Sequence, residues 1–146
     1  MKAKLKLFEI LNLEVELNGF VNLETGERLV EGLLQQKINF GLKYKLKNDT
    51  LKIVEEKKQI LKFQDELVSK YGTTDEQGRL GIDRWIDSEN KIPNPKFVEF
   101  NQEWNQFVTS NEKEVELTEL SLIDLQEVVT KDNYNTISTY FIKTNE

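Results

Sequence analysis

The longest element that the sequence predicts is a helix from Arg28 to Tyr71. It contains no proline, and its only glycines are Gly32 and Gly41. Apolar side chains recur along it at helical spacing, which is typical of a helix that packs against a partner: Leu34, Ile38, Leu42, Ile53, Ile60, Leu67 and Tyr71. Gly72 then provides a helix stop. A strand at 37–46 followed by a helix at 49–71 is an alternative, because apolar residues alternate with lysines from Ile38 to Leu46.

A second helix is predicted from Asn94-Pro95, an N-cap followed by proline at the first helical position. It ends at Thr109-Ser110-Asn111, and its predicted buried face is almost entirely aromatic: Phe97, Phe100, Trp104, Phe107 and Val108. We expect this helix to pack antiparallel against the long one. Residues 72–93 between them are interpreted as a long loop, with Ile82, Trp85 and Ile86 in one helical turn.

The two ends of the chain carry weaker signals. Residues from Leu5 to Leu17 fit a helix stopped by Asn18-Gly19, lying alongside the long helix, although Leu11 to Leu17 also alternate as in a strand. Leu23–Glu27 predicts a turn. Residues 112–146 are interpreted as a strand–helix–strand extension. Its expected parts are a strand at Val115–Leu117, a helix from Ser121 to about Val129, a turn at Lys131–Asn133 and a strand at Thr136–Ile142. We expect the last strand to pair with 114–118 or to end the domain as an extended arm.

Together these patterns predict a mainly α fold, with an antiparallel helical hairpin or small bundle and a short C-terminal β element. The length of 146 residues fits a single domain, 1–146. No run of about 18 apolar residues exists, and acidic residues interrupt the N-terminal segment, so we expect an intracellular protein with no membrane contact.

The absence of histidine and cysteine excludes the commonest catalytic groups. There can be no Ser-His-Asp triad, imidazole or thiolate metal ligand, or cysteine nucleophile. No glycine loop of the phosphate-binding type is present either. We therefore expect a protein that is not an enzyme and needs no cofactor or metal.

Charge is distributed unevenly along the chain. The net charge is −6, but residues 1–72 carry +2 and residues 73–146 carry −8. Either the two halves dock and neutralise each other, or they face two different partners. Nucleic acid is not an expected partner, because the chain is acidic overall and has only three arginines.

Two groups of residues are candidates for partner binding. The first is Trp85 with its charged neighbours Asp83, Arg84 and Asp87, since a tryptophan in a polar loop either plugs the end of a helical hairpin or anchors a partner. The second is Tyr44 with Lys43, Lys45 and Lys47, a basic–aromatic cluster that could meet an anionic ligand. The lysines could equally serve only to solubilise the helix.

The order of these signals resembles a family of small uncharacterised accessory proteins of tailed bacteriophages. The resemblance rests on generic motifs within about residues 28–130: Glu66–Gly72, Asn94–Glu103, Glu114–Leu117 and Ser121–Leu125. It implies a non-enzymatic bacteriophage protein that acts through protein–protein contacts in the host cytoplasm or the virion, most simply as a minor virion or assembly component. Expected partners are other phage or host proteins, or a second copy in a homo-oligomer. The alternative is an anti-defence protein that binds a host immune protein or sequesters a nucleotide signal.

Overall fold

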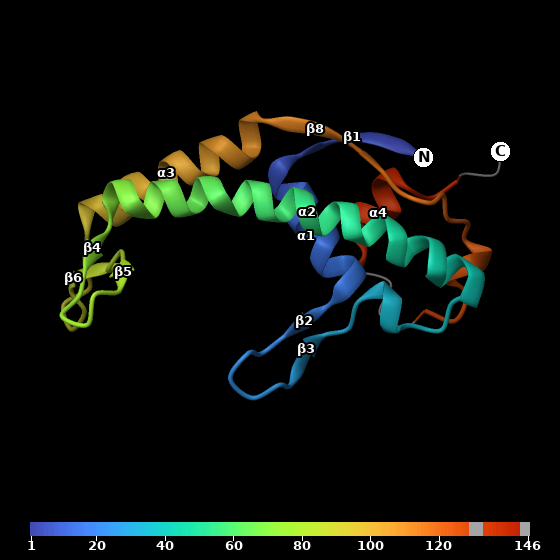
Figure 1. The fold of residues 1–146 in the computed structure, drawn as a ribbon, viewed down its shortest axis with the longest axis horizontal. Helices are drawn as coiled ribbons and strands as arrows, with labels where there is room; N and C mark the ends of the chain where they lie inside the picture. Colours follow the sequence, from blue (N-terminus) through green and yellow to red (C-terminus); the bar gives the residue numbers. More distant parts are fainter. Residues whose placement is uncertain (129–132, 144–146) are drawn as a thin grey trace. The chain divides into compact units, whose positions relative to one another are not determined.

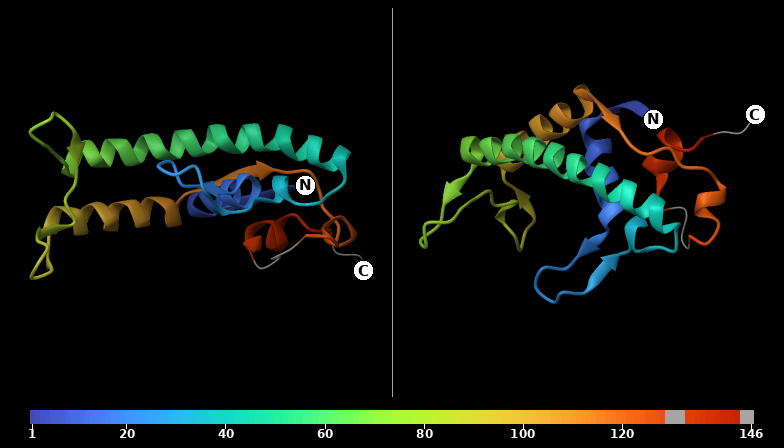
Figure 2. Two further views of the ribbon diagram at one scale, coloured as in Figure 1. Left: turned by 90° about the horizontal axis from the view of Figure 1, so that it is seen from below. Right: turned by 45° about the vertical axis from the view of Figure 1, so that its right-hand side comes forward.

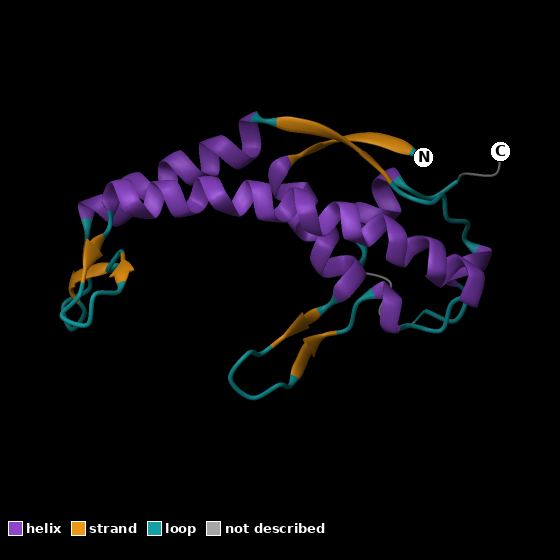
Figure 3. Ribbon diagram, in the orientation of Figure 1, coloured by secondary structure: helices purple, strands orange, loops and turns teal. Residues whose placement is uncertain are grey.

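The computed structural model describes residues 1–128 and 133–143. Within these residues the fold is mixed but mostly helical, with several two-stranded antiparallel sheets (Figures 1 and 3). The helices are α1 (Leu7–Asn18), α2 (Phe40–Tyr71), α3 (Pro95–Ser110) and α4 (Asn135–Tyr140), with 3-10 turns η1 (Leu33–Gln35) and η2 (Ile123–Leu125). The strands are β1 (Lys2–Lys6), β2 (Phe20–Val21), β3 (Arg28–Val30), β4 (Thr73–Thr74), β5 (Leu80–Gly81), β6 (Trp85–Asp87), β7 (Ile92–Pro93) and β8 (Glu112–Glu116).

The chain divides into two compact units. One comprises Met1–Lys57 and Glu112–Glu146 and is called the terminal unit below. The other, Lys58–Asn111, is called the hairpin unit. Helix α2 contributes residues 40–57 to the first and residues 58–71 to the second.

In the terminal unit, the N-terminal strand pairs with the strand that follows α3. Strand β1 pairs antiparallel with β8, and the terminal amine of Met1 donates a hydrogen bond to the Leu117 carbonyl at 2.9 Å. The register places each lysine of β1 opposite a glutamate of β8: Lys2 with Glu116, Lys4 with Glu114 and Lys6 with Glu112. Cross-strand pairs of opposite charge stabilise a sheet. Part of the charge difference between the halves is thus neutralised inside this unit.

The core of the terminal unit collects apolar residues from nearly every element in it. Its fully buried side chains are Leu5, Ile10, Leu13, Leu17, Leu33, Leu46, Ile53, Leu117, Leu120, Ile137 and Phe141. Polar bonds hold α2 to this core: the Asp49 carboxylate accepts from the backbone N–H (2.7 Å) and the hydroxyl (2.6 Å) of Thr118, and Lys57 pairs with Glu14 of α1 at 2.8 Å.

The predicted end of the first helix is confirmed. Gly19 follows α1 with φ +77°, a conformation that side chains with a Cβ rarely adopt. Its Cα also lies so close to the chain segment around Gly32 that a Cβ would meet the Val30 carbonyl at 2.4 Å. The predicted turn at Leu23–Glu27 is confirmed as the connection between β2 and β3.

The predicted long helix is confirmed from Phe40 to Tyr71 and is wrong for residues 28–39. Arg28–Val30 form β3, which pairs with β2, and Leu33–Gln35 form a 3-10 turn. The helix begins after Asn39, whose side-chain oxygen accepts from the Leu42 N–H at 3.2 Å. The alternative strand at 37–46 is wrong, because residues 40–46 are helical and the side chain of Leu46 is completely buried.

Two predictions for the C-terminal segment are also wrong. Of the residues predicted as a strand at Thr136–Ile142, 136–140 belong to α4, and β8 pairs with β1 instead of with them. Ile142 follows the helix and forms an isolated parallel bridge with Leu120. Buried Ile137 and Phe141 lie four residues apart on one face of this turn, so the tertiary environment overrides their strand propensity. The Ser121–Asp124 start is confirmed by hydrogen bonds between the two residues, but it opens only η2. Val129 and Lys131–Asp132 lie outside the described residues.

In the hairpin unit, residues 58–71 of α2 and α3 lie side by side and antiparallel, as predicted (Figure 2, left). The predicted loop at 72–93 contains two β-hairpins, β4–β5 and β6–β7, and Trp85 and Ile86 belong to β6 rather than to a helical turn. Gly72 is required at the end of α2, because a Cβ there would lie 2.4 Å from the Val68 carbonyl and 2.8 Å from the Gly81 carbonyl. Asn94 caps α3, accepting from the Lys96 N–H at 3.1 Å, as predicted.

Candidate functional site

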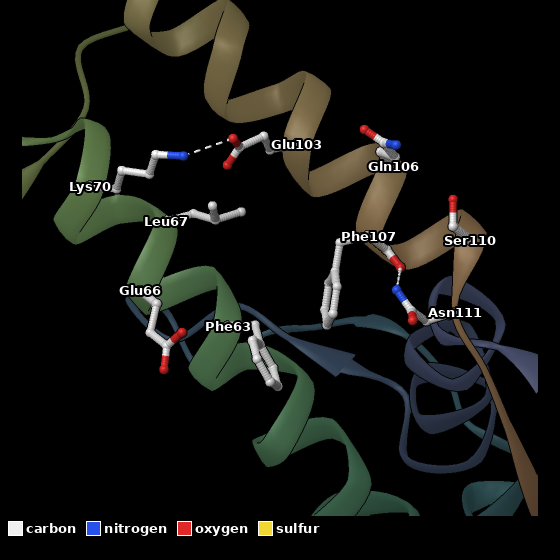
Figure 4. Close-up of a pocket in the computed structure, with 9 residues that line it drawn as sticks. All are labelled: Phe63, Glu66, Leu67, Lys70, Glu103, Gln106, Phe107, Ser110 and Asn111. Atoms are coloured by element: carbon white, nitrogen blue, oxygen red, sulfur yellow. Dashed lines mark hydrogen bonds and ion pairs between the residues drawn. The ribbon is translucent and has the colours of Figure 1, made fainter.

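A groove of about 620 Å³ runs between α2 and α3 in the hairpin unit (Figure 4). Both helices contribute side chains to it, and the end of α3 closes its border. The lining residues are Phe63, Glu66, Leu67, Lys70, Glu103, Gln106, Phe107, Ser110 and Asn111. The groove is therefore built entirely within one compact unit.

Two aromatic rings form the apolar part of this groove. The rings of Phe63 and Phe107 face each other across the two helices, with centroids 4.9 Å apart and planes inclined by 41°. Trp104 extends the cluster, its ring centroid 5.8 Å from that of Phe107. These distances fall within the range of favourable aromatic contacts. Half of the Phe63 surface is exposed, and Phe107 is half-buried.

The aromatic face of α3 was predicted as core, and it is only partly buried. Phe100 and Val108 are buried as expected, whereas Phe97, Trp104 and Phe107 remain half-buried. Helix α2 presents polar or charged side chains at many positions of its second half, so it covers this face incompletely. Of the rings that α2 does not cover, Phe107 lines the groove and Trp104 lies next to Phe107.

A single ion pair bridges the groove. Lys70 Nζ lies 2.9 Å from Glu103 Oε1 (Figure 4). The same nitrogen lies 5.0 Å from the centre of the Tyr71 ring. The hydrogen bond to Glu103, followed by that to Tyr71, raises the pKa of Lys70, and the bond from Lys70 lowers the pKa of Glu103. Both side chains are well exposed, and an exposed ion pair contributes little to stability. The main effect of the pair is to fix the positions of Lys70 and Glu103 at the rim of the groove.

Of the predicted partner-binding residues, Asp83, Arg84, Trp85 and Asp87 lie around the β6–β7 hairpin. Trp85 is half-buried and pairs with Pro93, and the Arg84 guanidinium lies over its ring at 5.1 Å from the centroid. This stacking supplies Trp85 with a cationic neighbour from its own chain. None of the four lines the groove.

Two of these residues hold the hairpin in place. Asp87 accepts hydrogen bonds from the Glu89 and Asn90 backbone and from the Asn90 side chain, and the side-chain bond is the main cause of its lowered pKa. The Asp83 carbonyl accepts from the Asn94 side chain at 2.7 Å. The carboxylate of Asp87 is thus engaged within its own turn.

The second predicted group lies in the terminal unit, on the first turns of α2. Tyr44, Lys45 and Lys47 are exposed, and Lys43 is half-buried beside a hollow lined mostly by residues 35–39 and 123–127. The two predicted groups therefore belong to different units.

Sequence reasoning missed the groove. Phe63 lies three residues after Ile60 and four before Leu67, so it continues the apolar helix stripe that the sequence does contain. That spacing was the available signal for Phe63. Gln106 and Ser110 lie one turn apart on α3 and carry no comparable signal.

The described residues contain no group of three or more acidic residues placed to hold a metal ion. Residues 1–128 and 133–143 also include no helix that combines the length and the apolarity needed to cross a bilayer. The groove offers aromatic surface, two carboxylates, one lysine and the polar groups of Gln106, Ser110 and Asn111.

Comparisons with protein-family models, with curated proteins and with solved structures found no match to this chain.

Proposed function

We propose that the chain is a non-enzymatic accessory protein of a tailed bacteriophage that acts through protein–protein contacts, as a minor virion or assembly component. The bacteriophage assignment rests on the sequence resemblance alone. The role in protein contacts is supported by one observation, the partly exposed aromatic groove between α2 and α3. We propose that the protein partner binds in this groove.

The character of the groove supports a protein partner. Protein interfaces combine partly exposed aromatic anchors with a polar rim, and Phe63, Phe107 and the Lys70–Glu103 pair provide both. One or two apolar side chains of a partner would cover the rings, while Gln106 and Ser110 offer hydrogen-bonding groups at the rim.

The charges of the groove do not suit a nucleotide. Its only lysine, Lys70, is bound to Glu103, and Glu66 adds a second carboxylate. A phosphate would therefore meet net negative charge, which opposes binding. This favours protein contacts over nucleotide capture at this groove.

The direct test is mass spectrometry of purified phage particles, together with deletion of the gene. We expect the protein to be present in the particles or particle yield to fall on deletion. Absence from the particles together with normal assembly would contradict the proposal, and a host protein recovered with the chain in that case would support the anti-defence alternative.

A matched pair of substitutions tests the groove itself. Gln106→Arg places a bulky charge on the groove, whereas Asn105→Arg makes the same change in charge at the adjacent exposed position outside it. We expect Q106R to lower incorporation into particles, or particle yield, at least about tenfold. A charge placed in a binding hot spot should weaken the binding free energy by about 1.4 kcal/mol or more, which corresponds to a tenfold loss of affinity. Equal behaviour of the two variants would exclude the groove as the binding site.

A further inference from the structure

A different surface, on the terminal unit, is unusually apolar for an exposed face. Four large exposed side chains lie in two short segments that border one hollow: Phe40 and Tyr44 in the first turns of α2, and Leu122 and Ile123 at η2. Their exposed fractions are 84%, 64%, 73% and 69%. Clustered exposed apolar residues of this size mark interaction surfaces more often than isolated ones do.

A hollow of about 730 Å³ lies between the same two segments. Lys37, Ile38 and Lys43 line it on the α2 side, and Ile123, Asp124 and Glu127 line it on the η2 side. Figures 1 and 2 show the start of α2 beside the segment that contains η2. Ile123 belongs to both groups, and we call the nine residues together the mixed-charge face.

The two sides of this face carry opposite charge. Lys37 and Lys43 make one side basic, and Asp124 and Glu127 make the other acidic. Among the residues that the structure describes, no ion pair within 4.0 Å joins the two sides across the hollow. Asp124 is instead bonded to Ser121, and Glu127 is exposed.

We propose that the mixed-charge face binds a second copy of this chain in a two-fold symmetric dimer. A two-fold axis through the hollow places the basic side of each copy against the acidic side of the other, so that both charge contacts form twice. The apolar side chains of the two copies then cover one another beside these contacts. A uniformly acidic or basic partner would meet like charge on one half of the face.

This dimer is independent of the proposed function. The mixed-charge face belongs to the terminal unit, and the groove belongs to the hairpin unit. Variants of the first alter self-association and variants of the second alter partner binding, so each proposal can fail without the other.

The test is analytical ultracentrifugation of the purified full chain from about 1 to about 100 µM, at low and high salt. We expect a monomer–dimer equilibrium that weakens with salt. Lys43→Glu and Glu127→Lys, each alone, should weaken dimerisation about tenfold or more, because each reverses two symmetry-related contacts. Lys45→Glu is the matched control: it makes the same charge change on α2 at an exposed residue that does not line the hollow, and should leave dimerisation unchanged.

Mixing the two impaired variants gives the decisive result. In a K43E/E127K heterodimer each contact again joins opposite charges, so the equimolar mixture should regain the dimerisation of the unmodified chain. Misfolding of either variant cannot produce this recovery. A chain that stays monomeric throughout, a mixture that does not recover, or species that grow beyond a dimer would each overturn the proposal.

Discussion

The buried carboxylate of Glu16 allows the packing of the terminal unit to be tested quantitatively. Glu16 lies on α1 with 7% of its surface exposed, and its Oε1 accepts the Ile137 N–H at the start of α4 at 3.1 Å. The backbone and hydroxyl of Thr136 bond to the same carboxylate. One side chain thus satisfies the polar groups that begin α4.

We predict that Glu16→Leu destabilises the terminal unit by about 3 kcal/mol, because it leaves two buried backbone donors without an acceptor at about 1.5 kcal/mol each. Glu16→Gln retains an oxygen acceptor in nearly the same place. Its free energy of unfolding near neutral pH should therefore stay within about 1 kcal/mol of the unmodified protein.

The pH dependence has a definite sign. Burial raises the pKa of Glu16 above its ordinary value of 4.5, against the opposing effect of the hydrogen bonds from Thr136 and Ile137. The folded chain therefore holds this proton more tightly than the unfolded chain does. Relative to E16Q, the unmodified protein should keep its full stability below pH 4.5, lose stability as the pH rises through the folded-state pKa, and show no further change above it.

Urea unfolding followed by far-UV circular dichroism measures this difference. Tryptophan fluorescence is unsuitable, because Trp85 and Trp104 both belong to the hairpin unit. Comparing the unmodified protein with E16Q at each pH cancels the titration of the other carboxylates. An E16L variant as stable as the unmodified protein, or a difference from E16Q that stays constant with pH, would refute the argument.

Three further substitutions test other parts of the fold. Gly72→Ala should destabilise the hairpin unit by about 2 kcal/mol, since its Cβ would clash with two carbonyl oxygens, while Gly81→Ala, with nothing within 4 Å, should be nearly neutral in thermal melts. Asn94→Ala should cost about 1–2 kcal/mol, because it removes the cap of α3 and the bond to the β6–β7 hairpin, and Trp fluorescence should report it. Lys4→Glu should cost about 1 kcal/mol by placing like charges across β1 and β8. The double variant Lys4→Glu/Glu114→Lys should recover part of that loss in urea unfolding, because it restores the cross-strand pair but removes the ion pair between Lys2 and Glu114. Failure of the double variant to recover would indicate that the charge pairing does not stabilise the sheet.

Local signals in the sequence predicted three of the helix boundaries correctly. Asn94-Pro95, Gly19 and Gly72 act within a few residues, and each lies at a helix end in the structure. The helical period of α2 and α3 also identified the antiparallel pair in the hairpin unit. These features depend on backbone conformation and side-chain spacing, both of which are local.

Predictions that depended on distant partners were less successful. Residues 136–142 have strand-like composition, but Glu16, more than a hundred residues earlier, accepts a hydrogen bond at the start of α4, and residues 136–140 are helical. Residues 28–30 lie in the proline-free segment predicted as helix, but they pair with β2. The partner of β8 is at the opposite end of the chain, so neither β1 nor its lysine–glutamate register could be predicted from either segment alone.

The candidate site shows the same division. The apolar residues of the groove were visible as helical stripes, yet stripes alone cannot tell a covered face from one left half open. That depends on which side chains the opposing helix presents, and α2 presents too few apolar ones to cover Phe107 and Trp104. The predicted partner residues around Trp85 and Tyr44 remain a prediction for binding.

By itself, the sequence determined the absence of histidine and cysteine chemistry, the helical periods of α2 and α3, and the helix ends at Gly19, Gly72 and Asn94, because these follow from residue type and spacing. Only the tertiary structure decided which strands pair, which terminal residues become helix and which aromatic rings stay exposed. Those outcomes depend on contacts between residues far apart in the chain, where burial and hydrogen bonding outweigh local preference.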